Sequence, residues 1–230
     1  MTGSLWHLIL ASFLFVGSHF MLSSTSVRTR LVSIFGPKPF LALYSVISIA
    51  LFIWMLLAYG DTPEIILWEP LLGFKHVSLT FMLFACLFVV GGYMTQNPAA
   101  IDTSGKSFKS SPKGVLKITR HPILWGIAFW GISHIFASGE VAKLILFGSL
   151  ILLALGGARH IDIRRRQELG DTWRGYEEKT SFFPLQAIIF GKVRVEKGEI
   201  PWWQTLISIA VYAGFLFGHG TLFGVSVTPF

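Results

Sequence analysis

The sequence predicts an all-α fold, a polytopic bundle of membrane-spanning helices, from its composition and from the way its apolar residues are grouped. Of the 230 residues, 53% are hydrophobic and only 13% are charged, and the mean hydropathy is +0.63. Soluble domains carry about 25% charged residues. The apolar residues form segments close to the roughly 20 residues that a helix needs to cross the hydrocarbon core. We therefore expect residues 1–230 to form a single integral membrane domain.

The apolar segments predict about six spans. The fourth and fifth are short and are joined only by residues 138–141, SGEV, so we expect a tight helical hairpin there. Cys86 is the only cysteine, which excludes an internal disulfide and a cysteine-based metal cluster. It lies within an apolar segment and is expected to be a small buried hydrophobic residue. The predicted spans are 4–22, 40–59, 76–94, 121–137, 142–158 and 203–223.

Two polar segments have different expected structures. Residues 161–183 carry charges, with Leu169, Trp173, Tyr176 and Phe182 at near-helical spacing. This pattern predicts a helix that continues past the fifth span, followed by a cytosolic amphipathic helix along the membrane surface. Residues 102–113, DTSGKSFKSSPK, are expected to form a polar loop.

The basic residues predict the orientation. The loops 23–39, 95–120 and 159–202 hold all of the 19 Lys and Arg residues except Lys75 and Lys143. Loops with such an excess of positive charge remain in the cytoplasm, so both termini are expected on the outer side. Topology and anionic lipid headgroups account for this charge, and we expect the lipid bilayer, not nucleic acid, as the partner.

The histidines separate by depth in this topology. Two side chains that bind one cofactor must lie at similar depth, which favours either His19 with His121 at the inner side or a pair within an outer group. A single histidine near the interface more often only marks the headgroup level. The inner histidines are His19, His121 and His160, and the outer group is His7, His76, His134 and His219.

The Arg120-His121-Pro122 triplet adds to the argument for His121. Proline suits the first turn of a helix, which would place His121 at the N-terminus of the fourth span. The positive end of the helix dipole and the charge of Arg120 then disfavour protonation of His121. A neutral imidazole is the form that binds a metal.

Four segments together point to a known family: residues 18–60, 118–135, 164–184 and 218–229. In these segments, and in their order, the chain resembles the NnrU family, a group of bacterial membrane proteins encoded near denitrification genes. The family is related to the plant 15-cis-ζ-carotene isomerases, membrane enzymes that use haem b. It is more distantly similar to the isoprenylcysteine carboxyl methyltransferases.

The resemblance implies a haem-b protein of the bacterial inner membrane. It would act in denitrification or nitric oxide metabolism, or as a cis–trans isomerase of an apolar polyene such as a carotenoid. Iron would be held by His19 and His121, with Arg28, Arg30 or Arg120 on the haem propionates, and the outer histidines are the alternative ligands. Helical bundles bind haem between facing side chains. The sequence has no Cys-x-x-Cys-His, which excludes covalent haem attachment.

Two other functions remain open. A membrane methyltransferase that uses S-adenosylmethionine would act through Arg120, His121, Glu168 and Tyr176, although Glu168 could instead form an ion pair with Arg120 or Arg165. A non-catalytic partner that helps to assemble a nitrite or nitric oxide reductase is the third hypothesis. The aromatic residues Trp125, Phe129 and Trp130 recur at helical spacing, a pattern that packing, lipid contact or a polyene would each explain.

Overall fold

The computed structural model describes residues 3–97, 111–225 and 227, and these residues form helices without a strand. Residues 102–110 of the predicted polar loop lie outside the described residues. The helices are α1 (Leu5–Ser23), α2 (Thr25–Phe35), α3 (Pro37–Gly60), α4 (Leu72–Met94), α5 (Val115–Ile118), α6 (Pro122–Ser138), α7 (Val141–Leu169), α8 (Asp171–Glu178), α9 (Gln186–Ile189) and α10 (Trp202–Phe223).

The predicted all-α membrane bundle is confirmed. The helices α1, α3, α4, α7 and α10 are long and apolar enough to cross a membrane, and α6 is a shorter apolar helix. Helix α7 extends 29 residues to Leu169, so it continues past the fifth span as expected. Residues 25–35, expected only as part of a loop, form α2, which ends where Gly36 takes a φ of 83° and Pro37 begins α3.

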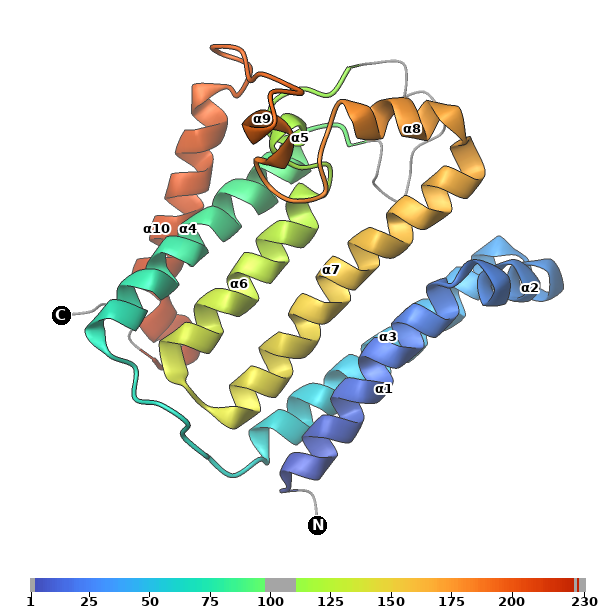
Figure 1. Cartoon of the computed structure of the whole chain (residues 1–230). Coiled ribbons are helices and arrows are strands. Elements are labelled where there is room, and N and C mark those ends of the chain that lie inside the picture. Colours follow the sequence, from blue (N-terminus) through green and yellow to red (C-terminus); the bar gives the residue numbers. More distant parts are fainter. Residues whose placement is uncertain (1–2, 98–110, 226, 228–230) are drawn as a thin grey trace.

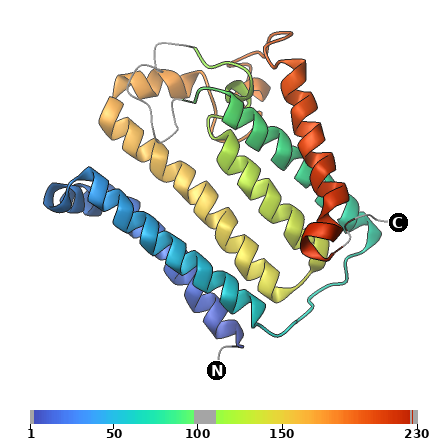
Figure 2. The same ribbon diagram turned by 180° about the vertical axis from the view of Figure 1, so that it is seen from behind.

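Helix α7 lies in the middle of the bundle. On one side it packs against α1, which contacts α3, and on the other side against α6, which contacts α4 and through it α10 (Figures 1 and 2). The largest core cluster lies between α1, α3 and α7 and includes Leu8, Phe15, Met55 and Phe147. Two groups of helices therefore share α7 as their common contact.

Helices α4 and α6 approach each other closely because glycine residues, which have no side chain, lie at their contact. A Cβ atom at Gly126 would lie 2.5 Å from Val89 Cγ2 and 3.1 Å from the Ala85 carbonyl oxygen. A Cβ at Gly92 would lie 2.9 Å from Pro122 Cγ. Small residues let helix backbones approach in membranes, where dispersion forces replace the hydrophobic effect as the main attraction between helices.

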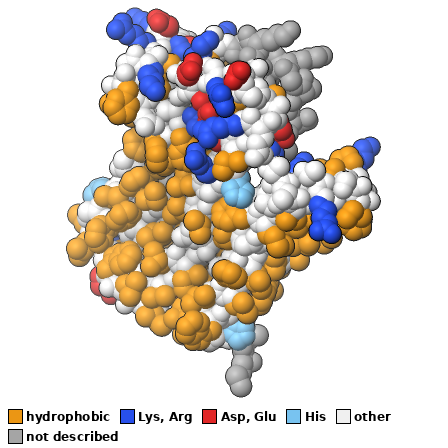
Figure 3. Space-filling model, turned by 45° about the vertical axis from the view of Figure 1, so that its right-hand side comes forward, with side chains coloured by type: hydrophobic (Ala, Val, Ile, Leu, Met, Phe, Trp, Pro, Cys, Tyr) orange, Lys and Arg blue, Asp and Glu red, His pale blue; other side chains and the backbone are white. Residues whose placement is uncertain are grey.

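The two ends of the bundle differ in charge. The end with α2, α5, α8 and α9, called the inner end from here on, carries most of the Lys and Arg side chains visible in Figure 3, and the middle is hydrophobic (Figures 1 and 3). The N-terminus, the loop 61–71 and the turn between α6 and α7 lie at the opposite, outer end. The basic loops of the sequence therefore meet at one end, as the topology prediction required.

The outer end confirms the tight hairpin at residues 138–141. Helix α6 ends at Ser138 and α7 begins at Val141, and Gly139 between them has a φ of 63°. The Leu67 amide donates to the Gly139 carbonyl at 2.8 Å, and a Cβ at Gly139 would overlap the Trp68 backbone. Glycine is required here both for its backbone conformation and for the closeness of the outer loop.

Replacing Gly126 by Ala should destabilise the bundle because the added methyl group overlaps α4. Overpacking of this kind costs roughly 1–3 kcal/mol. Gly148→Ala on α7 is the matched control, since nothing lies within 4 Å of its Cβ position. We expect a lower thermal midpoint for the detergent-solubilised Gly126→Ala variant, followed by circular dichroism, and an unchanged or higher midpoint for Gly148→Ala. Equal midpoints would show that the α4–α6 contact does not depend on this glycine.

Candidate functional site

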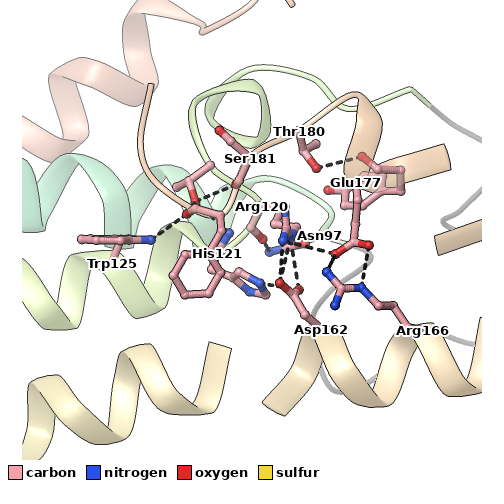
Figure 4. Close-up of polar contacts among 12 residues, drawn as sticks. Asn97, Arg120, His121, Trp125, Asp162, Arg166, Glu177, Thr180 and Ser181 are labelled. Carbon is pink, nitrogen blue, oxygen red and sulfur yellow. Dashed lines mark hydrogen bonds and ion pairs between the residues drawn. The ribbon is translucent and has the colours of Figure 1, made fainter. Parts of the chain in front are cut away.

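A buried ion pair joins the segment before α6 to α7. The Arg120 Nε atom donates to both carboxylate oxygens of Asp162, at 3.0 and 3.1 Å, and Nη2 donates to Oδ2 at 2.6 Å (Figure 4). Arg120 is 6% exposed and Asp162 is fully buried. A guanidinium and a carboxylate with several hydrogen bonds form one of the stronger polar contacts in proteins. This pair fixes the start of α6 against the inner part of α7.

His121 binds the same carboxylate. Its Nε2 atom donates to Asp162 Oδ1 at 2.7 Å, and the imidazole is almost completely buried. His121 caps the N-terminus of α6 and Pro122 occupies the first turn, as the sequence predicted. The sequence argument considered only the helix dipole and Arg120, whereas the structure adds a negative charge in direct contact. Because the carboxylate only accepts, this hydrogen bond places a proton on Nε2.

Glu177 and Arg166 extend the contact to α8. The Glu177 carboxylate accepts two hydrogen bonds from Arg166, at 2.7 and 2.8 Å, and lies 3.3 Å from Arg120 Nη2. We call Arg120, His121, Asp162, Arg166 and Glu177 the inner cluster. Its two guanidinium groups balance its two carboxylates, which is the condition for burying charge in an apolar bundle.

Helix α8 is held in place by its apolar face. Trp173 and Tyr176 are buried against Ile161 and Leu169, so three of the four residues chosen for their helical spacing share one face. The fourth, Phe182, lies after the end of α8 and contacts His121 instead. Burial raises the pKa of the Tyr176 hydroxyl above its usual value, so the phenol is neutral at physiological pH. The apolar face of α8 thereby positions Glu177 toward Arg120.

Hydrogen bonds attach the segment before α6 to the segment after α8. Thr119 Oγ1 and Trp125 Nε1 both donate to the Phe182 carbonyl, at 2.7 and 2.8 Å. The ring of Phe182 contacts the His121 imidazole, with 5.6 Å between ring centroids.

Beside these contacts a pocket of about 480 Å³ opens at the inner end. It is lined by Arg120, Glu177, Thr180, Ser181, Phe182, Gln186, Ala187, Phe190 and Lys192.

The structure does not bring the inner histidines of the sequence prediction together. His19 lies on α1, where its Nδ1 donates to the Phe15 carbonyl at 2.7 Å and its ring contacts Tyr44. Helix α7 stands between α1 and α6 (Figure 1), and among the described residues His19 and His121 make no contact with each other. The Nε2 atom of His121 is already bonded to Asp162, so an iron atom there would have to displace this hydrogen bond.

The arginines expected at the haem propionates also have protein partners. The Arg28 guanidinium lies over the Phe40 ring, 5.3 Å from its centroid. Arg120 is held by Asp162 and Glu177. Both arginines therefore already contact protein groups in this structure.

Two histidines of the outer group do come together. His134 on α6 and His219 on α10 have ring centroids 6.5 Å apart. His7 instead lies at the start of α1, where its Nδ1 is 2.9 Å from Ser4 Oγ, and His76 lies near the start of α4. We call His134 and His219 the outer histidine pair.

Sequence reasoning missed Asp162, Arg166 and Glu177, which complete the inner cluster. One signal was available, because Asp162 is the only acidic residue between Glu140 and Glu168 along α7. It lies just beyond the apolar part of the helix, among basic residues, and a carboxylate that is buried there requires a cationic partner. The suggestion that Glu168 pairs with an arginine is confirmed, since it lies 3.1 Å from Arg165. Cys86 is buried, as expected.

The fold and the inner cluster define a multi-pass helical membrane protein with a network of ion pairs at its basic end. The chain belongs to the NnrU protein family, whose model matches residues 7–227. This confirms the resemblance found in the sequence. No solved structure matches the chain.

Curated relatives are found in plants. A chloroplastic 15-cis-zeta-carotene isomerase from Zea mays is 31% identical over 84 residues, which is 36% of this chain and 23% of the relative. The chloroplastic 15-cis-zeta-carotene isomerase of Arabidopsis thaliana is 28% identical over 116 residues, 49% of this chain and 32% of the relative. The matched part is therefore at most about a third of each plant protein.

Removing the carboxylate of Asp162 should strongly destabilise the protein. Asp162→Ala leaves the Arg120 charge buried without its main partner, a change that costs about 3–5 kcal/mol. Glu168→Ala is the matched control, because the Glu168 side chain is 47% exposed and exposed ion pairs contribute only about 0–1 kcal/mol. Thermal unfolding in detergent measures both. Similar midpoints for the two variants would contradict the assignment of the inner cluster as a structural constraint.

Proposed function

We propose that this protein is a membrane cis–trans isomerase of a linear polyene, with haem b as its cofactor. Membership of the NnrU family and the similarity to plant 15-cis-zeta-carotene isomerases support the reaction class. The proposed location is the bacterial inner membrane, with the basic inner end in the cytoplasm and both termini in the periplasm. An apolar polyene partitions into the bilayer, so the enzyme would meet its substrate through its lipid-facing surface.

A continuous line of aromatic rings carries the substrate proposal; five of them lie on α4 and α6, and Phe183 follows α8. Starting at the inner end, successive centroids are 5.8, 5.6, 5.8, 6.3 and 5.7 Å apart. We call this line the aromatic track, and in order it consists of Phe183, Trp125, Phe129, Phe81, Phe136 and Phe74.

The aromatic track is elongated and accessible from the bilayer, as a binding site for a linear polyene would be. From Trp125 to Phe136 the track follows α6 for about 16 Å at 1.5 Å per residue. Phe129 and Phe81 are half-buried, and Phe183 is 54% exposed, so the rings are accessible from the bilayer. Flat conjugated systems pack favourably on aromatic faces and edges. Trp130, grouped with these residues in the sequence, contacts Phe147 on α7 instead and belongs to the core.

Haem b would supply a redox-active, Lewis-acidic iron when bound. The contribution of the chain is to exclude water from the substrate and to hold it flat along α4 and α6, so that rotation about one double bond can be promoted in a fixed orientation. Roles in nitric oxide metabolism or denitrification, in methyl transfer, or as an assembly partner remain predictions from the sequence, and no contact described above favours them over isomerisation.

The test is conversion of 15-cis-zeta-carotene by the purified protein in haem-supplemented liposomes, kept in the dark and analysed by chromatography. We expect Phe129→Ala to reduce conversion about tenfold and the milder Phe129→Leu to reduce it about twofold or more. The reason is that one aromatic contact contributes roughly 0.5–1.5 kcal/mol in addition to the burial of its apolar area. Phe13→Ala is the matched control, because Phe13 is 70% exposed on α1.

The two possible failures have different meanings. No conversion by a folded protein that contains haem would contradict the proposed reaction. If the Phe129 variants and the Phe13 control convert the substrate equally well, the proposed reaction stands. The aromatic track is then not the substrate site.

A further inference from the structure

We propose that the pocket at the inner end binds an anionic phospholipid. The lipid phosphate would lie beside Arg120 and Lys192, and the acyl chains would extend over the apolar surface next to Phe190. This inference goes beyond the proposed function and does not depend on it, because it needs neither a polyene nor a cofactor. A failure of the isomerase proposal would therefore leave it unchanged.

The charges that line the pocket favour an anion. Arg120 and Lys192 line it together with the carboxylate of Glu177. That carboxylate already accepts two hydrogen bonds from Arg166, at 2.7 and 2.8 Å, so its charge is balanced. The Lys192 side chain is exposed and forms no ion pair with any residue that the structure describes. Lysine and arginine both form strong, charge-assisted hydrogen bonds with phosphate.

Arg120 keeps one donor group for a ligand. Its hydrogen bonds to Asp162 use Nε and Nη2, and its contact with Glu177 also uses Nη2. Within the described part of the chain, Nη1 makes no hydrogen bond, although the side chain is buried and lines the pocket. A guanidinium has five N–H donors, and buried donors are seldom left without an acceptor. A phosphate oxygen in the pocket would accept from Nη1.

The opposite wall of the pocket is polar and is held in place by hydrogen bonds. The Arg120 amide donates to the Ser181 carbonyl at 2.9 Å, and the Ala187 amide donates to Ser181 Oγ at 3.2 Å. The buried Thr180 hydroxyl donates to the Tyr176 carbonyl at 2.8 Å, so its lone pairs can accept from a hydroxyl group of a lipid headgroup. The pocket is thus preformed, as sites for small ligands usually are.

Apolar side chains continue from the pocket along the surface. Phe190 lines the pocket and is 69% exposed, and Ile189 and Leu185 nearby in the chain are also exposed. We call these three residues the apolar rim. Leu185 has a φ of 64°, which is unusual for a residue with a side chain, and its amide donates to the Ile118 carbonyl at 2.8 Å, which holds the turn in this conformation. Apolar side chains next to cations fit the boundary between headgroups and acyl chains.

The pocket lies at the depth of the lipid headgroups. Helix α9, which contributes Gln186 and Ala187 to its lining, lies at the inner end near the points where α6 and α10 begin (Figure 1). Trp202 and Trp203 at the start of α10 are exposed, and tryptophan concentrates at the interface between membrane and water. A phospholipid of the adjacent leaflet could therefore reach the pocket without leaving the bilayer.

The experiment is native mass spectrometry of the purified protein in a neutral detergent, titrated with phosphatidylglycerol or with zwitterionic phosphatidylcholine of the same acyl chains. We expect the wild type to bind phosphatidylglycerol about tenfold more tightly. Lys192→Ala should weaken this binding about tenfold, the effect of losing one hydrogen bond to a charged group. Lys197→Ala is the matched control, because Lys197 is exposed in the same connecting segment and does not line the pocket.

A second pair of variants and a competition distinguish a lipid from a free phosphate. Phe190→Ser should weaken phosphatidylglycerol binding about fivefold through lost apolar contact, whereas Phe217→Ser, at a residue 78% exposed on α10, should not. Inorganic phosphate or glycerol phosphate in large excess should not displace the lipid, because neither reaches the apolar rim. The proposal is overturned if the two lipids bind equally, if Lys192→Ala behaves like Lys197→Ala, or if free phosphate displaces the lipid. Circular dichroism verifies that each variant is folded.

Discussion

The buried contact between Arg120 and Asp162 is the constraint on which the inner end of the structure depends. Neither charge could remain in the apolar bundle alone, because the cost of burying an ion far exceeds the stability of a typical protein. The pair therefore determines where the segment before α6 meets α7. His121 contacts the Asp162 carboxylate and Glu177 contacts the Arg120 guanidinium. Because Glu177 belongs to α8, its contact with Arg120 also positions that helix.

This arrangement distinguishes His121 from the outer histidines. His121, whose motif is the most conspicuous in the sequence, is committed to Asp162, whereas His134 and His219 lie in ordinary apolar segments and keep an unbonded ring nitrogen. His134 and the inner cluster thus lie toward opposite ends of α6. The aromatic track runs along the same helix between them.

Much of the fold could be predicted from hydropathy, because a helix that crosses a bilayer must satisfy its own backbone hydrogen bonds and expose apolar side chains. All six apolar segments are helices, and the turn at Gly139 is where SGEV predicted it. The existence of α2 was harder to predict. Polar residues near a membrane surface fold into helices or loops according to their tertiary contacts, and hydropathy does not distinguish these outcomes.

The sequence by itself determined the class of protein, the number and order of the apolar helices, the clustering of basic loops at one end and the depth of each histidine. Only the tertiary structure decided which polar groups meet. Depth along a helix follows from sequence position, but the direction in which a side chain points around the bundle depends on which helices are neighbours. That is why Asp162, 41 residues after His121 in the chain, became its partner, while His19 was placed on the other side of α7.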